Sequence, residues 1–333
     1  RRAAGAAGLR RRAFAPLARR RRRALASILH ERCALYTAPM LCALHGEERW
    51  IAPRVEEARA RALSAAGALR CPCCGEPVLY RAGERVTAHF AHRAGADCAL
   101  SADPDYRPES DLHLSTKLAI HDWIRAVHPD ARVEIEAAVP DVGQRADVLA
   151  TIAGTTIAFE VQCSPLSGAA WRARHAGYAR ARIRDVWILA GHAPAFAMIP
   201  ASERRGLLAS FRFHLRDLAA TIVHETGELL LAWAPVPKRD RSRAPLHFEL
   251  QRGLPANEGP IVAALSAIAA HHARAGARAF RDRPFRDRLV IGGAFVFAAP
   301  LARCALDPAL GLLVGDRHAA ALRAALAREA AAA

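Results

Sequence analysis

The sequence has few lysines, few aromatic residues and no long apolar run. Only Lys117 and Lys238 are lysines among its 48 basic residues, and aromatic residues make up 6% of the chain. The longest uninterrupted apolar stretch, residues 289–302, has 14 residues and contains two glycines. That length is below the roughly 20 residues that a transmembrane helix requires. We therefore predict no membrane-spanning helix.

The composition that remains indicates a globular protein with a buried core. Hydrophobic residues make up 52% of the chain and charged residues 24%, which are ordinary values for a folded domain and exclude disorder throughout. A length of 333 residues favours two domains and an appendage. The sequence has eight cysteines but no secretory signal pattern, so we expect free thiols or a metal site, and a cytoplasmic protein.

The positive charge is concentrated at the start of the sequence. Residues 1–39 hold eleven arginines and one acid, a net charge of +10, and residues 40–333 contribute the remaining +6 of the total of +16. A disordered arginine-rich segment binds phosphates without specificity. The first methionine is Met40, and a strand-like pattern begins there. We expect residues 1–39 to be a basic, disordered leader, with a basic arm or a targeting segment as the alternative.

The apolar pattern divides the rest of the chain into three parts. Residues 40–100 are expected to form a zinc-finger-like module, residues 101–195 an α/β core, and residues 196–333 a mostly helical C-terminal region of unknown role. The core pattern follows the order helix, three strands, helix, strand. The expected elements are a hairpin over 41–52 and a helix over 55–66 in the module, the core elements 110–127, 132–139, 145–152, 155–162, 167–182 and 185–189, and a helix near 261–273.

Four of the eight cysteines lie between positions 71 and 98, next to two histidines. Cys71 and Cys74 form a Cys-x2-Cys turn that directs two thiolates at one ion, and His92 and Cys98 can complete a tetrahedron. We expect these four residues to bind a structural zinc ion, with His89 as an alternative ligand. Free buried thiols are the other interpretation.

Two acidic residues are placed to meet across a hairpin. Hydrophobicity alternates on both sides of Ala153 and Gly154, and if these two residues form the turn, Asp147 faces Glu160. Their Cβ atoms would lie about 5 Å apart, where like charges are destabilising. A hard divalent cation such as Mg²⁺ or Mn²⁺ resolves that conflict. Two solvated edge acids are the alternative. Gln162 shares the face of Glu160.

Helices on either side of this hairpin carry further polar residues. Glu109, His113 and Lys117 stand four residues apart, so they share one helix face. An ordinary intrahelical ion pair explains the same spacing. On the helix that follows the hairpin, Arg174 and Tyr178 can bind a phosphate of a nucleic acid, and a packed surface explains them equally well.

Taken in order, these motifs resemble the competence protein CoiA family. The resemblance extends from Met40 to about Gly191. It rests on Cys-Pro-x-Cys at 71–74, His-Phe-Ala-His at 89–92, Cys98, Glu109-Ser110-x2-His113-x3-Lys117, Ala-Asp-Val at 146–148 and Glu-Val-Gln-Cys-Ser-Pro-Leu-Ser at 160–167. The resemblance implies a zinc-finger-like module followed by a nuclease-like domain of the PD-(D/E)xK restriction-endonuclease superfamily, associated with the handling of incoming DNA in transformation and recombination.

The resemblance also implies roles for individual residues. Asp147 corresponds to the acid of the second core strand, Glu160 to the first acid of the E-x-K element, and Glu109 to the helix acid. Gln162 departs from the wider superfamily, which usually has a lysine at this place. Glutamine cannot supply the positive charge that stabilises an attacking hydroxide. Lys117 on the neighbouring helix is the residue that could supply it.

The function predicted from these residues is metal-dependent hydrolysis of DNA. Asp147 and Glu160 would hold Mg²⁺ or Mn²⁺, and Lys117 with Gln162 would orient the attacking water. Glu109 would complete the metal shell, and His113 would assist. The expected partners are DNA, single-stranded or branched forms included, and recombination or competence proteins.

Two other functions compete with this hypothesis. A non-catalytic DNA-binding accessory protein would use the nuclease fold and the zinc module for docking, and the missing motif lysine favours it. A cysteine hydrolase with Cys163 and His175 is disfavoured, because Cys163 has the opposite strand parity to Glu160 and points away from its face.

Overall fold

The computed structural model describes residues 39–84, 86–93, 95, 96, 98, 110–139, 142–191, 196–200, 211–242, 245–255, 257–266 and 288–332. Two predictions lie outside the described residues, namely the basic leader up to residue 38 and the role of Glu109. None of the described helices is long and apolar enough to cross a membrane.

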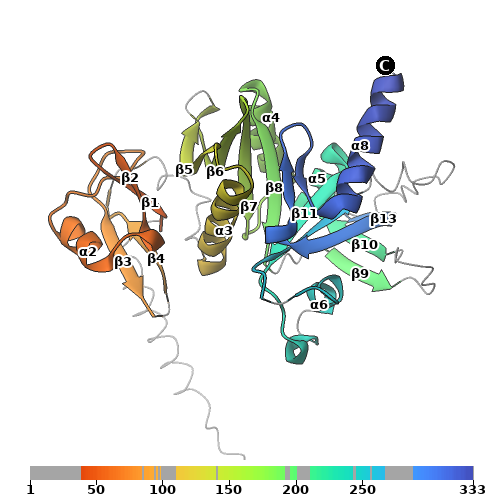
Figure 1. Ribbon diagram of the computed structural model, residues 1–333, viewed down its shortest axis with the longest axis horizontal. Coiled ribbons are helices and arrows are strands. Elements are labelled where there is room, and N and C mark those ends of the chain that lie inside the picture. Colours follow the sequence, from red (N-terminus) through yellow and green to blue (C-terminus); the bar gives the residue numbers. More distant parts are fainter. Residues whose placement is uncertain are drawn as a thin grey trace, which may run out of the picture.

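The N-terminal module consists of two small hairpins and one helix (Figure 1). Its elements are β1 (Cys42–His45), β2 (Glu48–Ile51), η1 (Ala52–Arg54), α2 (Glu57–Ala65), β3 (Leu79–Gly83) and β4 (Val86–Ala91). The hairpin and the helix predicted here are both present. Trp50, Leu69 and Phe90 form the centre of its small core. The backbone of Met40 pairs with that of Phe90, which ties the start of the module to β4.

The central segment has the predicted order of helix, three strands, helix and strand. Its elements are α3 (Asp111–Val127), β5 (Arg132–Val139), β6 (Gln144–Ile152), β7 (Thr155–Gln162), α4 (Gly168–Arg180) and β8 (Arg184–Ala190). Both helices begin with a serine cap, because the side chains of Ser110 and Ser167 accept hydrogen bonds from the backbone N–H groups three residues later. The sequence therefore defines both helix starts.

The remaining elements add five strands to the same sheet, and they also form helices and a separate two-stranded sheet. They are β9 (Phe196–Pro200), β10 (Phe211–Arg216), α5 (Asp217–Thr226), β11 (Glu228–Trp233), η3 (Lys238–Asp240), α6 (Pro245–Leu250), β12 (Ile261–Ser266), β13 (Arg288–Pro300), η4 (Leu301–Arg303), β14 (Ala305–Asp307), β15 (Gly311–Leu313) and α8 (Gly315–Ala332). The strand order in the nine-stranded sheet is β5-β6-β7-β8-β11-β12-β13-β10-β9. The pairs β7·β8 and β8·β11 are parallel and the other pairs are antiparallel.

The prediction of a mostly helical C-terminal region is wrong. Strands β9 to β13 continue the central sheet, and the expected helix near 261–273 begins as strand β12. The residues of β12 are buried on both faces of the sheet, so its sequence is a continuous apolar run. Periodicity alone cannot distinguish such a strand from a buried helix. Residues 267–273 lie outside the described residues.

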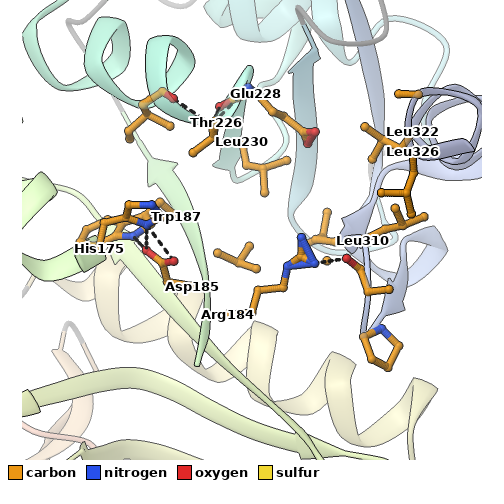
Figure 2. A pocket seen from close by; sticks show the side chains of 17 residues that line it. His175, Arg184, Asp185, Trp187, Thr226, Glu228, Leu230, Leu310, Leu322 and Leu326 are labelled. Carbon is orange, nitrogen blue, oxygen red and sulfur yellow. Dashed lines mark hydrogen bonds and ion pairs between the residues drawn. The ribbon is translucent and has the colours of Figure 1, made fainter. Parts of the chain in front are cut away.

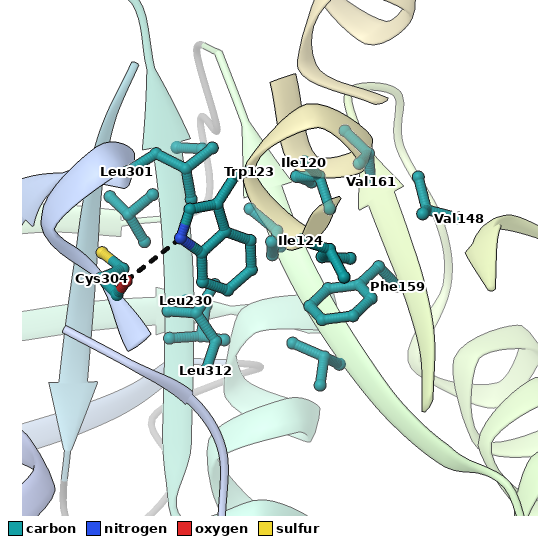
Figure 3. Close-up of a cluster of buried hydrophobic side chains, with 14 of the residues drawn as sticks. Ile120, Trp123, Ile124, Val148, Phe159, Val161, Leu230, Leu301, Cys304 and Leu312 are labelled. Atoms are coloured by element: carbon teal, nitrogen blue, oxygen red, sulfur yellow. Dashed lines mark hydrogen bonds between the residues drawn. The ribbon is translucent and has the colours of Figure 1, made fainter. Parts of the chain in front are cut away.

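Helices cover both faces of the sheet. Val186 and Ile188 of β8 pack in the core beneath α3, whereas Trp187 and Leu189 pack with Trp171 of α4 on the other face. The core beneath α3 also contains η4, β14 and β15 (Figure 3). The C-terminal region thus supplies part of the hydrophobic core that α3 covers.

Candidate functional site

Four predicted metal ligands lie together in the N-terminal module. The donor atoms of Cys71, Cys74, His92 and Cys98 all lie within 4.8 Å of one another. Sγ of Cys74 is 3.3 Å from Nε2 of His92. In the part of the chain that the structure describes, this is the only group of three or more Cys, His, Asp or Glu donors at such spacing. A Cys3His set of this kind could hold a metal ion such as zinc.

The local chain path explains why these four residues meet. Cys71 and Cys74 lie in the turn before β3, where the N–H of Gly75 donates to the Cys71 carbonyl and Gly75 adopts a φ of 71°. His92 directly follows strand β4. His89 is not part of the group. Its Nδ1 lies 2.8 Å from the carbonyl oxygen of Thr87.

The hairpin that carries the two acids has the predicted register. Strands β6 and β7 turn at Ala153 and Gly154, which both have positive φ. Val148 pairs with Phe159, as a turn at these two residues requires. The backbone ladder ends at this pair, one position before the two acids. Beyond this pair, β6 continues beside β5 and β7 continues beside β8, and the two acids lie in separate polar environments.

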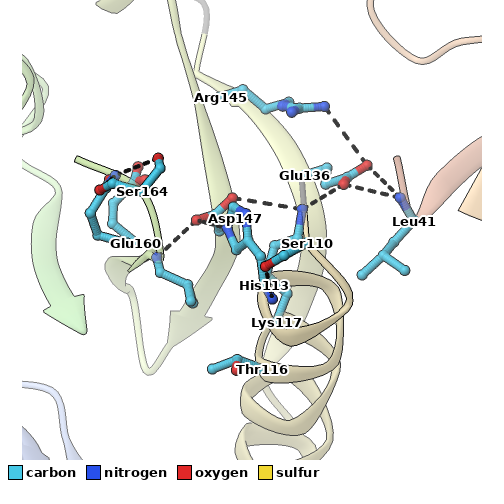
Figure 4. Close-up of polar contacts among 12 residues, drawn as sticks. Leu41, Ser110, His113, Thr116, Lys117, Glu136, Arg145, Asp147, Glu160 and Ser164 are labelled. Carbon is cyan, nitrogen blue, oxygen red and sulfur yellow. Dashed lines mark hydrogen bonds and ion pairs between the residues drawn. The ribbon is translucent and has the colours of Figure 1, made fainter. Parts of the chain in front are cut away.

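Asp147 belongs to a network with helix α3 (Figure 4). Its Oδ2 lies 3.1 Å from Nε2 of His113 and accepts from the N–H of Val161 at 2.8 Å. Its Oδ1 lies 3.8 Å from Nζ of Lys117. Burial raises the pKa of Asp147, but His113 and Lys117 lower it by more, so the pKa lies well below its usual range. Asp147 is therefore ionised at neutral pH.

Glu160 belongs to a second network, with helix α4. Its Oε2 accepts from the guanidinium of Arg174 at 2.7 Å, and its Oε1 accepts from the hydroxyl of Tyr178. Its side chain is 3% exposed. Burial raises the pKa of Glu160 to about 7; Arg174 opposes this shift and the charge of Asp147 adds to it. The two acids differ in protonation although they occupy matched strand positions.

Lys117 is completely buried. Its Nζ donates to Oε1 of Glu136 at 2.7 Å, in addition to its contact with Asp147. Sequence reasoning missed Glu136. It lies opposite Asp147 in the β5–β6 register, in which Ile135 pairs with Val148. Had that register been known, Glu136 would have been a candidate, since cross-strand neighbours share a site.

Other predicted site residues have different surroundings from those expected. Gln162 donates its amide to the carbonyl oxygen of Ser164 at 2.7 Å. Tyr178 is fully buried, so its predicted contact with a nucleic acid is wrong for this conformation. The ring packs in the core, and the hydroxyl donates a hydrogen bond to Glu160. The side chain of Arg174 is one-third exposed and remains accessible to a ligand.

A cavity of about 480 Å³ lies away from both acids (Figure 2). His175, Asp185 and Trp187 line it, and both the imidazole and the indole are hydrogen-bonded to the Asp185 carboxylate. Cys163 instead packs against the core beneath α3, on the opposite face of the sheet from His175. The geometry gives no support to a cysteine hydrolase.

In comparisons with known proteins, two family models match separate parts of the chain. The family model described as "Competence protein CoiA, N-terminal domain" matches residues 53–101, which include the Cys/His group. The model described as "Competence protein CoiA, nuclease-like domain" matches residues 109–196, which include Asp147 and Glu160. The core with the two acids is thus of the nuclease-like class.

A curated relative supports the same conclusion. Competence protein CoiA of Bacillus subtilis (strain 168) is 30% identical over 119 residues, which are 36% of this chain and 30% of that protein. No solved structure matches the chain significantly. Together with the two domain matches, this similarity shows that residues 53–196 are similar to the N-terminal and nuclease-like domains of the competence protein CoiA family.

Proposed function

We propose that the chain is a metal-dependent deoxyribonuclease that hydrolyses phosphodiester bonds in DNA during transformation or recombination. The observation that carries the proposal is the pair of buried carboxylates, Asp147 and Glu160, on neighbouring strands of the nuclease-like domain, each one position beyond the last pair of the β6–β7 ladder. One carboxyl group is strongly acidic and the other titrates near neutrality. Buried acids with divergent pKa values are typical of catalytic sites.

The proposal includes a restriction-endonuclease-like core of the PD-(D/E)xK type. The order of α3, the antiparallel strands β5 to β7, α4, and a β8 parallel to β7 supports it. In that pattern Asp147 is the acid of the second strand. Glu160 and Gln162 occupy the E-x-K positions, with glutamine in place of lysine.

The charge of the site fits a divalent cation. Asp147 and Glu160 would hold Mg²⁺ or Mn²⁺, because carboxylate oxygens are preferred ligands of both ions. Burial and the charge of Asp147 disfavour ionised Glu160, and a cation held by both acids would favour it. The bound ion would polarise the scissile phosphate and lower the pKa of a water ligand.

Three cationic or titratable side chains next to the acids have proposed roles. Lys117 supplies a fixed positive charge beside Asp147, in place of the lysine absent from position 162. His113 holds the Asp147 carboxylate in position. Arg174 is accessible and would exchange its contact with Glu160 for a DNA phosphate. Gln162 would orient the attacking water, and Glu109 would complete the metal shell.

The Cys/His group would hold a structural zinc ion. A site with four protein ligands has no open position for a substrate, so this ion would stabilise the module without taking part in catalysis. The module and the basic body would contact DNA phosphates, in single-stranded or branched DNA as well as in duplexes. Recombination or competence proteins are further proposed partners.

Cleavage assays with the full chain test the nuclease. Single-stranded, duplex and branched DNA are incubated with Mn²⁺ or Mg²⁺ and either the natural chain, Asp147→Asn or Glu160→Gln. Each variant is expected to lower kcat by at least about a hundredfold, because each removes a carboxylate that holds the ion. Glu225→Gln is the matched control, since this exposed acid pairs only with residues outside the site, such as Arg172. Undiminished cutting by both site variants would contradict the assignment.

A non-catalytic DNA-binding accessory protein is the second candidate, and one observation favours it. Both oxygens of Glu160 already have partners, Arg174 and Tyr178, as in a purely structural network. This function predicts DNA binding that weakens with salt and survives Asp147→Asn and Glu160→Gln, without hydrolysis of any DNA form.

A further inference from the structure

Glu136 has an unusual backbone conformation in the middle of strand β5. Its φ is +54°, whereas the residues on either side keep their pairing with β6. Glu134 and Glu136 would share a face in a regular strand. The left-handed conformation breaks that alternation and turns the Glu136 side chain into the interior, where it is 4% exposed. Such a conformation in a residue other than glycine is held in place by its surroundings.

The Glu136 carboxylate is held by the N-terminal module and by helix α3 at once (Figure 4). The N–H of Leu41 lies 3.0 Å from each of its oxygens, and the N–H of Cys42 lies 3.3 Å from Oε2. Nζ of Lys117 donates to Oε1 at 2.7 Å. Arg145 adds a fourth positive or donating group at 3.8 Å. Although burial raises it, Lys117 and Arg145 lower the pKa of Glu136, so it is ionised.

The position of Lys117 depends on this carboxylate. A fully buried ammonium group requires anionic partners, and Glu136 is the nearer of its two carboxylates. The second, Asp147, is the proposed metal ligand. Glu136 therefore determines how closely the Lys117 charge approaches the candidate site.

The module is attached to the core immediately beside Glu136. Nη1 of Arg49, in strand β2, donates to the carbonyl oxygen of Ile135 at 2.7 Å, and Nη2 lies 3.3 Å from Oε2 of Glu134. Docking of the β1–β2 hairpin therefore fixes both the backbone around Glu136 and the N–H groups that its carboxylate accepts.

We propose that Glu136 is a positioning residue that makes the placement of Lys117 beside Asp147 depend on docking of the N-terminal module. The effect on catalysis rests on the proposed nuclease function. The link between module docking and the position of Lys117 rests on geometry alone. With the module docked, its two N–H groups and Lys117 share one carboxylate. If the module is displaced, Glu136 loses the hydrogen bonds from the two backbone N–H groups. The position of its carboxylate, and with it the position of the Lys117 ammonium group, then changes.

The scarcity of lysine provides a direct readout. Lys117 and Lys238 are the only lysines of the sequence. An NMR spectrum of full-length protein labelled with ¹³C at the lysine Cε therefore has two signals. The signal that is missing in Lys238→Arg belongs to Lys238. Lys238 is exposed and serves as the internal reference. Glu136→Gln removes the charge that pairs with Lys117. Arg49→Ala removes docking contacts and leaves every residue of the site intact.

The coupling predicts that the Lys117 signal responds in both variants. The chemical shift of Lys117 is expected to change in Glu136→Gln and in Arg49→Ala, and that of Lys238 to stay constant. Arg61→Ala is the matched control, since Arg61 is half-exposed on α2 of the same module and pairs with Glu57. An unchanged Lys117 signal in Arg49→Ala overturns the proposal, even if Glu136→Gln fails to fold.

Cleavage assays on the same proteins decide the catalytic consequence. We expect Glu136→Gln and Arg49→Ala to lower kcat about tenfold to a hundredfold with little change in KM, as loss of residues that orient a site does. Natural kcat in variants whose Lys117 signal has moved overturns the positioning role. If the natural chain cuts no DNA, the proposed function fails by itself, and the Lys117 signal still decides whether module docking controls this residue.

Discussion

At the scale of single residues, Asp147 and Glu160 occupy matched strand positions but have opposite electrostatic surroundings. His113 and Lys117 hold Asp147 ionised, whereas burial keeps Glu160 protonated up to about neutral pH. Arg174 offsets only part of this effect. The site therefore gains one negative charge when Glu160 loses its proton near pH 7. A bound metal ion would compensate this charge.

The stability of the metal-free protein should report this titration. The pKa of Glu160 in the folded state is about 7, above the usual 4.5, so the folded state binds this proton more tightly. The contribution is fully present below the unfolded pKa and is lost as pH rises through 7, by up to about 3 kcal/mol. Glu160→Gln cannot titrate and should have a free energy of unfolding that falls less between pH 5 and 8.

Urea unfolding over this pH range, without added Mg²⁺ or Mn²⁺, measures the difference. Glu225→Gln is the control, because it removes an exposed carboxylate and should follow the natural chain. Parallel pH profiles for the natural chain and Glu160→Gln would show that Glu160 titrates normally.

Much of the candidate site could be predicted from the sequence. The turn at Ala153 and Gly154 and the helical spacing of His113 and Lys117 on α3 are two features that depend only on local geometry. Tyr178 and Glu136 could not be placed correctly. The burial of the Tyr178 ring depends on packing between α4 and the sheet, and the positive φ of Glu136 reverses the alternation from which its face would be inferred.

At the scale of elements, the Cys/His group joins a turn, a hairpin and the chain that follows it. Without a shared ion, the thiol groups of Cys71 and Cys74 and the imidazole of His92 contribute little to holding these segments together. We expect purified protein to contain about one equivalent of zinc, and expect Cys74→Ser and His92→Ala to lose it and to melt at lower temperature.

Metal analysis together with thermal unfolding tests this expectation. Cys73→Ser is the matched control, because Cys73 lies in the same turn but is exposed and outside the group. Zinc well below one equivalent in the natural chain would contradict a structural site, as would a Cys73→Ser variant that loses zinc to the same extent as Cys74→Ser.

Elements between residues 110 and 190 could be predicted because local signals define them. Serine caps begin both helices, and two residues with positive φ form the hairpin turn. Strand β12 could not be predicted, because its apolar run acquires its conformation from β11 and β13 on either side. Pairing with these neighbouring strands, which no local sequence pattern encodes, determines that this segment is a strand.

At the scale of the whole molecule, the sheet crosses the boundary between the nuclease-like segment and the C-terminal region. Strand β11 pairs with β8, and Leu230, Leu301 and Leu312 fill the core beneath α3. A chain that ends after residue 195 would expose this core and leave β8 as an open edge. We expect it to aggregate or to unfold cooperatively at lower denaturant concentration than the full chain.

Circular dichroism and limited proteolysis of the truncated and full chains check this prediction. A chain ending after residue 314, which lacks only helix α8 and the final residue, is the control and should retain the sheet. A stable, protease-resistant fragment of residues 40–195 would show that the C-terminal region is dispensable for folding.

The indole N–H of Trp123 donates to the carbonyl oxygen of Cys304, a residue 181 positions later in the chain (Figure 3). During synthesis that acceptor leaves the ribosome long after Trp123 itself, when both hairpins of the N-terminal module are already complete. The half-made protein therefore carries an incomplete apolar core until the C-terminal region is made, and we expect this stage of translation to be the one most prone to aggregation.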